Sequence, residues 1–107
     1  MAKYLYEVHF VRGRSNPEHD VFLRNVLELN AKTSDYGGIN NLCVVSHHKD
    51  RDTVFELCAD GLKKSKNDLS VIEITKTTLN SPNGTHRLFR DLIETYFLPN
   101  ANYPNVK

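Results

Sequence analysis

Hydrophobic and polar positions along this chain follow the period of a strand in some segments and of a helix in others. Residues 3–11 alternate as a strand with apolar groups on both faces, and residues 17–31 read as an amphipathic helix. Residues 39–46 form a second apolar strand, residues 52–66 a second helix, and residues 69–78 a further strand. The pattern therefore predicts strands and helices that alternate along the chain.

The segment between the first helix and the second apolar strand decides the fold. Residues 32–36 are polar and precede Gly37 and Gly38, and a glycine pair supplies the positive φ angles of a tight hairpin turn. We therefore expect a short extra strand here. The fold class is then α+β, a ferredoxin-like βαββαβ sandwich with a four-stranded antiparallel sheet. If residues 32–36 are only a loop, the order becomes βαβαβα with a parallel sheet.

A final helix is predicted after Thr85, with its apolar residues on one side, and Pro99 ends it. We expect residues 1–98 to be a single ferredoxin-like domain with this C-terminal helix, and residues 99–107 to be a flexible tail. No stretch approaches the roughly 20 apolar residues that cross a membrane, so we expect a cytoplasmic protein with no membrane partner.

Charge and cysteine content narrow the function only slightly. Fourteen Lys and Arg residues face 13 Asp and Glu residues, and a net charge of +1 argues against strong non-specific binding to nucleic acid. A local basic patch is still compatible with this balance. Cys43 and Cys58 lie within apolar runs, which is typical of buried free thiols.

The candidate catalytic residues lie in the polar connection between the second apolar strand and the second helix. His47 or His48 could act as a general base on a ribose hydroxyl, and Lys49 or Arg51 could stabilise a pentacoordinate phosphorane. A loop that only caps the helix and carries solvated side chains explains the same residues. Adjacent histidines on a strand point to opposite faces and lack the spacing of a helical metal pair, so we predict no metal site.

Candidate phosphate ligands follow the first strand. Arg12 and Arg14 flank Gly13, and guanidinium groups bind phosphates in a bidentate manner. The glycine spacing fits no nucleotide-binding loop, and we predict no cofactor. Val11 and Arg12 occupy the place where a two-metal nuclease of this fold would need a carboxylate. Tyr4 and Tyr6 suit base stacking on an open sheet, although core packing explains them as well.

The arrangement resembles the start of the GhoS antitoxin family. The residues that carry the resemblance are Tyr6, Val8 and Phe10, the segment Val21–Arg24, the strand Leu42–Ser46 and the terminal segment Phe89–Phe97. The resemblance implies a ferredoxin-like fold related to CRISPR adaptation nucleases and an endoribonuclease that cleaves a toxin's messenger RNA. It also implies an RNA contact for Arg24, which matches in register.

Two hypotheses follow. The first is a small intracellular RNA-acting or regulatory domain of the antitoxin type, with metal-independent endoribonuclease activity. The alternative is a non-enzymatic protein-interaction or dimerisation module that docks through a sheet edge or the last helix.

Overall fold

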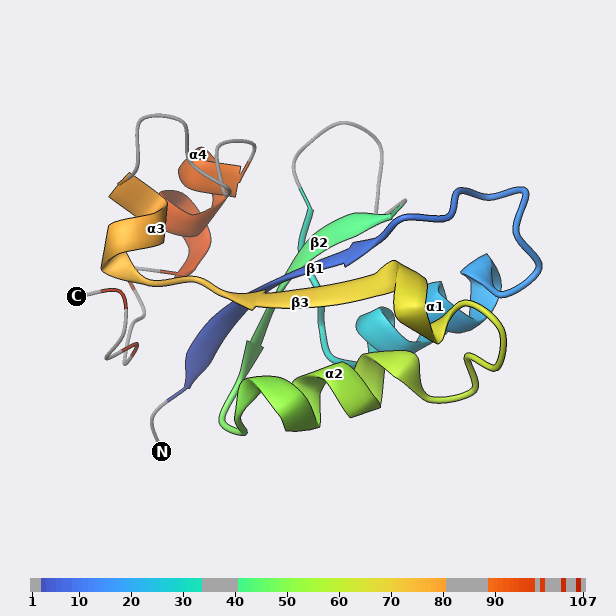
Figure 1. The fold of residues 1–107 in the computed structure, drawn as a ribbon. Helices are drawn as coiled ribbons and strands as arrows, with labels where there is room; N and C mark the ends of the chain where they lie inside the picture. The colour runs from blue at the N-terminus through green and yellow to red at the C-terminus, as the bar shows by residue number, and fades with distance from the viewer. Residues whose placement is uncertain are drawn as a thin grey trace.

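The protein has an α+β fold. The structure, a computed structural model, describes residues 3–33, 41–80, 89–97, 99, 103 and 106. Among these residues the sheet has three antiparallel strands in the order β2-β1-β3. The strands are β1 (Tyr4–Phe10), β2 (Leu42–His47) and β3 (Leu69–Glu73), with β1 at the centre (Figure 1). The alternative parallel sheet is wrong, because β1 pairs antiparallel with both neighbours.

Two helices cover one face of this sheet. They are α1 (His19–Glu28) and α2 (Arg51–Ala59), which lie side by side below the strands in Figure 1. The alternation of β1 turns Tyr6, Val8 and Phe10 toward them, and all three side chains are buried with apolar residues of both helices. The first two predicted helices are thus confirmed.

The second helix is shorter than predicted because the backbone turns sharply after it. Asp50 caps its first turn by accepting the Thr53 N–H at 2.9 Å, as expected of an acidic residue there. At the other end Asp60 leaves the helical conformation, with φ −59° and ψ 119°, and Gly61 has a φ of +87°. That backbone angle favours glycine and breaks the helical repeat, so residues 63–65 form a loop.

The opposite face of the sheet is covered by the C-terminal part of the chain. This part includes α3 (Lys76–Asn80), α4 (Arg90–Leu92) and a π-helical turn, η3 (Ile93–Phe97). Apolar residues of these elements pack on Leu5, Val44 and Ile74. Tyr103 and Val106, which fall in the predicted flexible tail, are also buried in this cluster, and the Tyr103 hydroxyl lies 3.1 Å from Ser46 Oγ.

The predicted strand over residues 69–78 ends early. β3 stops at Glu73, because Thr75 and Thr78 cap each other and start a helix. The Thr75 N–H donates to Thr78 Oγ1 at 2.9 Å, and the Thr78 N–H donates to Thr75 Oγ1 at 3.2 Å. This reciprocal pair is equivalent to a capping box, a local signal that the apolar alternation had concealed.

The extra strand predicted over residues 32–36 is not seen as a strand among the described residues, where Lys32 forms only an isolated bridge. Lys32 pairs antiparallel with Val44 on the outer side of β2, through hydrogen bonds of 2.9 and 2.8 Å. Residues 34–36 of that predicted strand, and the predicted start of the last helix at Thr85, lie outside the described residues. In the portion of the chain that the structure describes, no helix is long and apolar enough to cross a bilayer.

Candidate functional site

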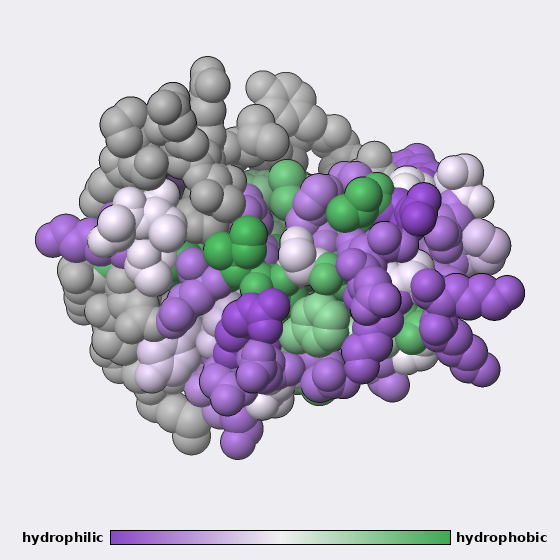
Figure 2. Space-filling view, in the orientation of Figure 1, coloured by the Kyte–Doolittle hydropathy of each residue, from purple (hydrophilic) through white to green (hydrophobic). Residues whose placement is uncertain are grey.

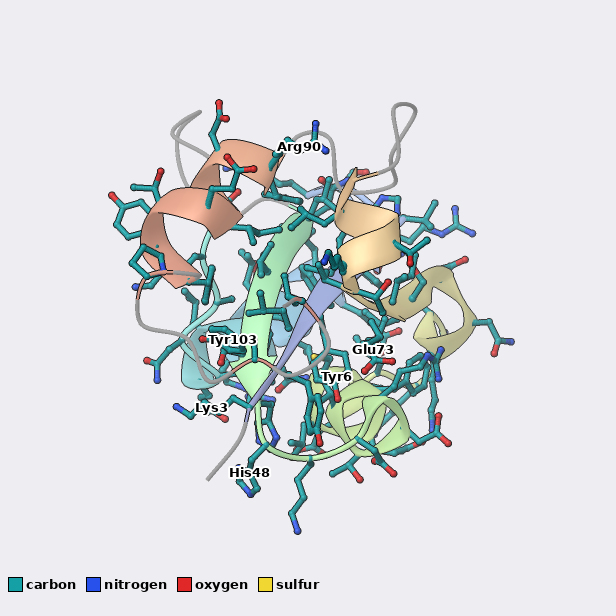
Figure 3. All side chains as sticks on the ribbon, turned by 90° about the vertical axis from the view of Figure 1, so that its left-hand side faces the viewer. Lys3, Tyr6, His48, Glu73, Arg90 and Tyr103 are labelled. Atoms are coloured by element: carbon teal, nitrogen blue, oxygen red, sulfur yellow. The ribbon has the colours of Figure 1, made fainter. Side chains whose placement is uncertain are left out.

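A shallow pocket of about 620 Å³ lies where β1 and β3 meet the N-terminus of α2. It is lined by Tyr4, Tyr6, His48, Asp50, Arg51 and Glu73. Figure 3 shows Tyr6 next to Glu73, with His48 toward the same end of the sheet. The pocket therefore gathers two phenols, an imidazole, a guanidinium and two carboxylates from segments far apart in the sequence.

The strands position the floor of this pocket. Tyr6 on β1 and Glu73 on β3 are register partners, so their side chains emerge next to each other on the face that α2 covers. Tyr4 precedes Tyr6 by two residues and therefore lies on the same face. The Tyr6 hydroxyl donates to the Lys49 carbonyl at 2.6 Å, and this bond holds the loop before α2 against the sheet.

The surroundings of Tyr6 keep its phenol protonated. Burial, followed by the negative charges of Glu73 and Asp50, raises the pKa of Tyr6 to about 12. The pKa of Asp50 is lowered, chiefly by its hydrogen bonds to Thr53 at the start of α2. Tyr6 is therefore a hydrogen-bond donor in this pocket and not a base.

The two adjacent histidines differ in their roles. The Lys49 N–H donates to His47 Nδ1 at 3.0 Å, and burial, followed by the charges of His48 and Lys49, lowers the pKa of His47. The imidazole rings stack with centroids 4.7 Å apart. The expectation that the rings point to opposite faces was wrong, because His48 lies beyond the end of β2. Only His48 lines the pocket.

Arg51 is anchored at the side of the pocket. Its Nε donates to the Val71 carbonyl at 2.7 Å, and Nη1 donates to Asp52 at 2.8 Å. Val71 lies on the edge strand β3, so this bond ties the first turn of α2 to the edge of the sheet. Further guanidinium N–H groups are available for an anion, because the side chain is 49% exposed. Lys49 is also exposed and lies in the loop beside His48.

The predicted phosphate ligands Arg12, Arg14 and Arg24 do not join this pocket. Arg12 follows the other end of β1, about 20 Å away along the strand, and forms an ion pair with Asp68 at 2.9 Å. Arg14 is exposed in the loop that follows. The Arg24 guanidinium lies beside Gly61, just beyond the end of α2. The structure thus separates these three arginines from the predicted acid–base loop.

A second pocket, of about 460 Å³, lies at this opposite end and contains a bound carboxylate of the protein itself. The backbone N–H groups of Lys63, Lys64 and Ser65 donate to Glu18 at 2.7, 2.9 and 2.8 Å, and the Ser65 hydroxyl donates to it at 2.5 Å. These bonds lower the pKa of Glu18 to about 2. Arg12 lines the same pocket.

The other reactive side chains have structural surroundings. Cys43 and Cys58 are free thiols in the core between the sheet and the helices, and burial raises the pKa of each, to about 12 for Cys58. Within the described ranges, no three His, Cys, Asp or Glu side chains are grouped in a way that could hold a metal ion.

Sequence reasoning missed Glu73 and Glu18. Glu73 looks like an ordinary polar position of an alternating strand, and only its register with Tyr6 places it in the pocket. Glu18 looks like an ordinary acidic residue at the start of a helix, whereas its hydrogen-bond partners lie 45 to 47 residues away. No local pattern signals contacts of that range.

Comparisons of the chain with known protein families, with curated proteins and with solved structures found no match.

Proposed function

We propose that this protein cleaves RNA without a metal ion, in the pocket formed by Tyr4, Tyr6, His48, Arg51 and Glu73. The observation that carries the proposal is the position of an imidazole, a carboxylate and a guanidinium around one solvent-accessible hollow. These are the groups that a transphosphorylation at a ribose needs: one accepts a proton, one donates a proton and one stabilises charge at phosphorus.

The proposed reaction assigns one role to each group. Glu73 takes the proton of the ribose 2′-hydroxyl, and the 2′-oxygen attacks the neighbouring phosphorus. Arg51 donates hydrogen bonds to the phosphorane oxygens, and His48 gives a proton to the departing 5′-oxygen. The products are a 2′,3′-cyclic phosphate and a 5′-hydroxyl. Histidine suits the donor role because a protonated imidazole is a common general acid in proteins.

The base in this scheme differs from the sequence-based expectation. That expectation gave the base role to His47 or His48. His47 does not line the pocket, and its Nδ1 already accepts a hydrogen bond. His48 shares the pocket with the carboxylate of Glu73, so Glu73 can be the base and His48 the acid. Lys49 stays a candidate for electrostatic support. Tyr4 is partly exposed and provides aromatic surface for a nucleotide, whereas Tyr6 is 1% exposed and its hydroxyl holds the Lys49 carbonyl.

The fold is part of the proposal. We take the Lys32–Val44 bridge as the edge of a fourth strand beside β2, which would complete the ferredoxin-like sandwich. That arrangement supports the resemblance to the GhoS antitoxin family, and with it a messenger RNA substrate. The buried free thiols are compatible with the reducing cytoplasm, where we expect the protein to act.

The alternative is a module that binds a protein partner or a second copy through a sheet edge or the last helix. Phe89 and Phe97, the natural contacts of that helix, are buried against the protein's own sheet, and Tyr96 is the exposed aromatic residue among its described positions. The last helix therefore offers a partner less apolar surface than its sequence suggested.

The test is RNA cleavage by purified protein in excess EDTA, with paired variants. We expect His48→Gln and Glu73→Gln each to lower the cleavage rate about 100-fold or more, because each removes a general acid or base. The matched controls are His9→Gln, on the other face of β1, and Glu94→Gln, on the exposed side of η3. An equal loss in the controls, or full activity in both pocket variants, would contradict the proposal.

A further inference from the structure

Beside the proposed catalytic pocket, a strip of cationic and aromatic side chains follows α2 along β3. We define the α2–β3 strip as Arg51, Phe55, Lys66, Lys63 and Lys64. Arg51 belongs to both the pocket and the strip. Figure 2 shows hydrophobic side chains exposed in the middle of this face, with hydrophilic side chains around them.

Phe55 is the centre of the strip. It lies one helical turn after Arg51 and is half-buried against the core. The Arg51 guanidinium carbon lies 5.8 Å from the ring centroid, and Lys66 Nζ lies 5.9 Å from it. Both cations therefore lie over this ring, which places positive charge for phosphates directly beside an aromatic side chain on which a base could stack once a cation moves aside.

The cations of the strip are accessible to a ligand. Arg51 and Lys66 are 49% and 46% exposed, and their partners Asp52 and Glu56 are exposed as well. Exposed ion pairs contribute little, so a phosphate can replace either carboxylate at small cost. Within the described part of the chain, no carboxylate forms an ion pair with Lys63 or Lys64, and both side chains are exposed.

The two ends of the strip connect the two pockets. Arg51 opens on the catalytic pocket, whereas Lys63 and Lys64 line the second pocket together with Arg12. The nine residues of α2 span about 14 Å between these ends. Charge and stacking surface thus continue from the proposed reaction centre to the predicted phosphate ligand Arg12.

We infer that single-stranded RNA binds along the α2–β3 strip, with a base stacked on Phe55 and its backbone phosphates on Lys66, Lys63 and Lys64. The inference rests on the proposed function for the placement of the scissile bond in the pocket. A single strand fits this strip because an unpaired base presents a free face to the ring. RNA duplexes hide their base faces and offer only phosphates to these lysines.

The experiment measures binding without cleavage. RNA of about eight nucleotides, in the usual size range of such sites, carries 2′-O-methyl groups that block the reaction, and its fluorescence anisotropy is followed with salt. We expect Lys66→Gln and the Lys63→Gln/Lys64→Gln double variant to lower the slope of log K against log salt by about 0.7 per lysine. Lys32→Gln, at the opposite edge of the sheet, is the matched control and should leave the slope unchanged.

The aromatic contact has its own variant. Phe55→Leu keeps an apolar side chain in the core, and we expect it to weaken binding about fivefold to 100-fold, as the loss of one stacked base does. Tyr96→Leu, at an exposed aromatic residue of η3, is the control. A thermal melt of Phe55→Leu shows whether the variant is still folded at the temperature of the binding assay, and so separates lost stacking from lost folding.

The outcomes separate this inference from the proposed function. RNA that binds through the strip but is not cleaved in its unmodified form would refute the catalytic proposal alone. Cleavage with unchanged binding in the lysine and Phe55 variants would refute the strip alone. Equal binding of duplex RNA, or a Phe55-dependent dimer in light scattering, would also overturn it.

Discussion

Replacement of Asn25 tests how α1 fixes the end of α2. This side chain is 5% exposed, and its Nδ2 donates to the Cys58 carbonyl at 2.9 Å and to the Asp60 carbonyl at 2.7 Å. Both carbonyls belong to the C-terminal turn of α2, where a helix has no backbone partners of its own. Asn25→Leu keeps the branching and the number of heavy atoms of the side chain and removes both donors.

The expected loss in the free energy of unfolding is the sum of one contribution from each carbonyl. The Cys58 carbonyl is in a buried bond, and an unsatisfied buried acceptor costs about 1–3 kcal/mol. The Asp60 carbonyl is only partly buried, so water can replace the amide, and the loss there is about 1 kcal/mol. Together we expect Asn25→Leu to lower the free energy of unfolding by about 2–4 kcal/mol, which shifts Tm by about 10–20 °C for a domain of this size.

The assay is urea unfolding followed by circular dichroism, with Asn25→Asp as a second variant. Asn25→Asp should destabilise at least as much, because it places an acceptor against two carbonyl oxygens. The m-value should not change, since the surface exposed on unfolding is the same. A loss below about 0.5 kcal/mol in both variants would show that these bonds do not hold α2, and the reasoning would fail.

Three further perturbations test other parts of the structure. Glu18→Gln should lower the Tm of the protein at neutral pH. The difference in Tm between the variant and the wild type should vanish as pH falls from about 4.5 to about 2, because a carboxyl with a lowered pKa loses its stabilising effect over that range. A pH-independent difference would refute this. Gly61→Ala should lower the free energy of unfolding in urea by about 1–2 kcal/mol, because alanine would have to adopt a φ of +87°. Its Cβ would also lie only 3.1 Å from a side chain of α1. Gly13→Ala should be nearly neutral, because a Cβ there meets nothing within 4 Å. Equal losses of stability in Gly61→Ala and Gly13→Ala would contradict the claim that position 61 requires glycine. Tyr6→Phe should lower stability by about 1 kcal/mol and raise the amide hydrogen exchange rate at Lys49, and unchanged exchange would show that the phenol does not hold that loop.

The sequence predicted most of the elements because their signals are local. Alternation located β1 and β2, and the second helix begins within one residue of its predicted start, after the Asp50 cap. The end of β3 was missed because apolar alternation persisted through Ile74, whereas the capping pair that begins with Thr75 decides the backbone. Local apolar pattern and local capping conflicted there, and capping prevailed.

The candidate site was predicted only in part because it depends on strand register. The sequence identified His48 and Arg51 because they lie in the connection between a strand and a helix, and both line the pocket. Glu73 joins them through its pairing with Tyr6, and Arg12 is separated from them by the length of β1. Both facts follow from which residues pair across the sheet, and a single sequence does not state that pairing.

The products of the RNA reaction test the central claim most directly. Purified protein would be incubated in EDTA with an oligonucleotide and with the same oligonucleotide carrying one 2′-deoxynucleotide at the cleaved position, and the fragments identified by mass spectrometry. The proposed roles of Glu73, Arg51 and His48 predict 2′,3′-cyclic phosphate and 5′-hydroxyl ends, with no cleavage at the deoxynucleotide. Fragments with 5′-phosphate ends, cleavage at the deoxynucleotide, or no cleavage of either RNA would contradict the account.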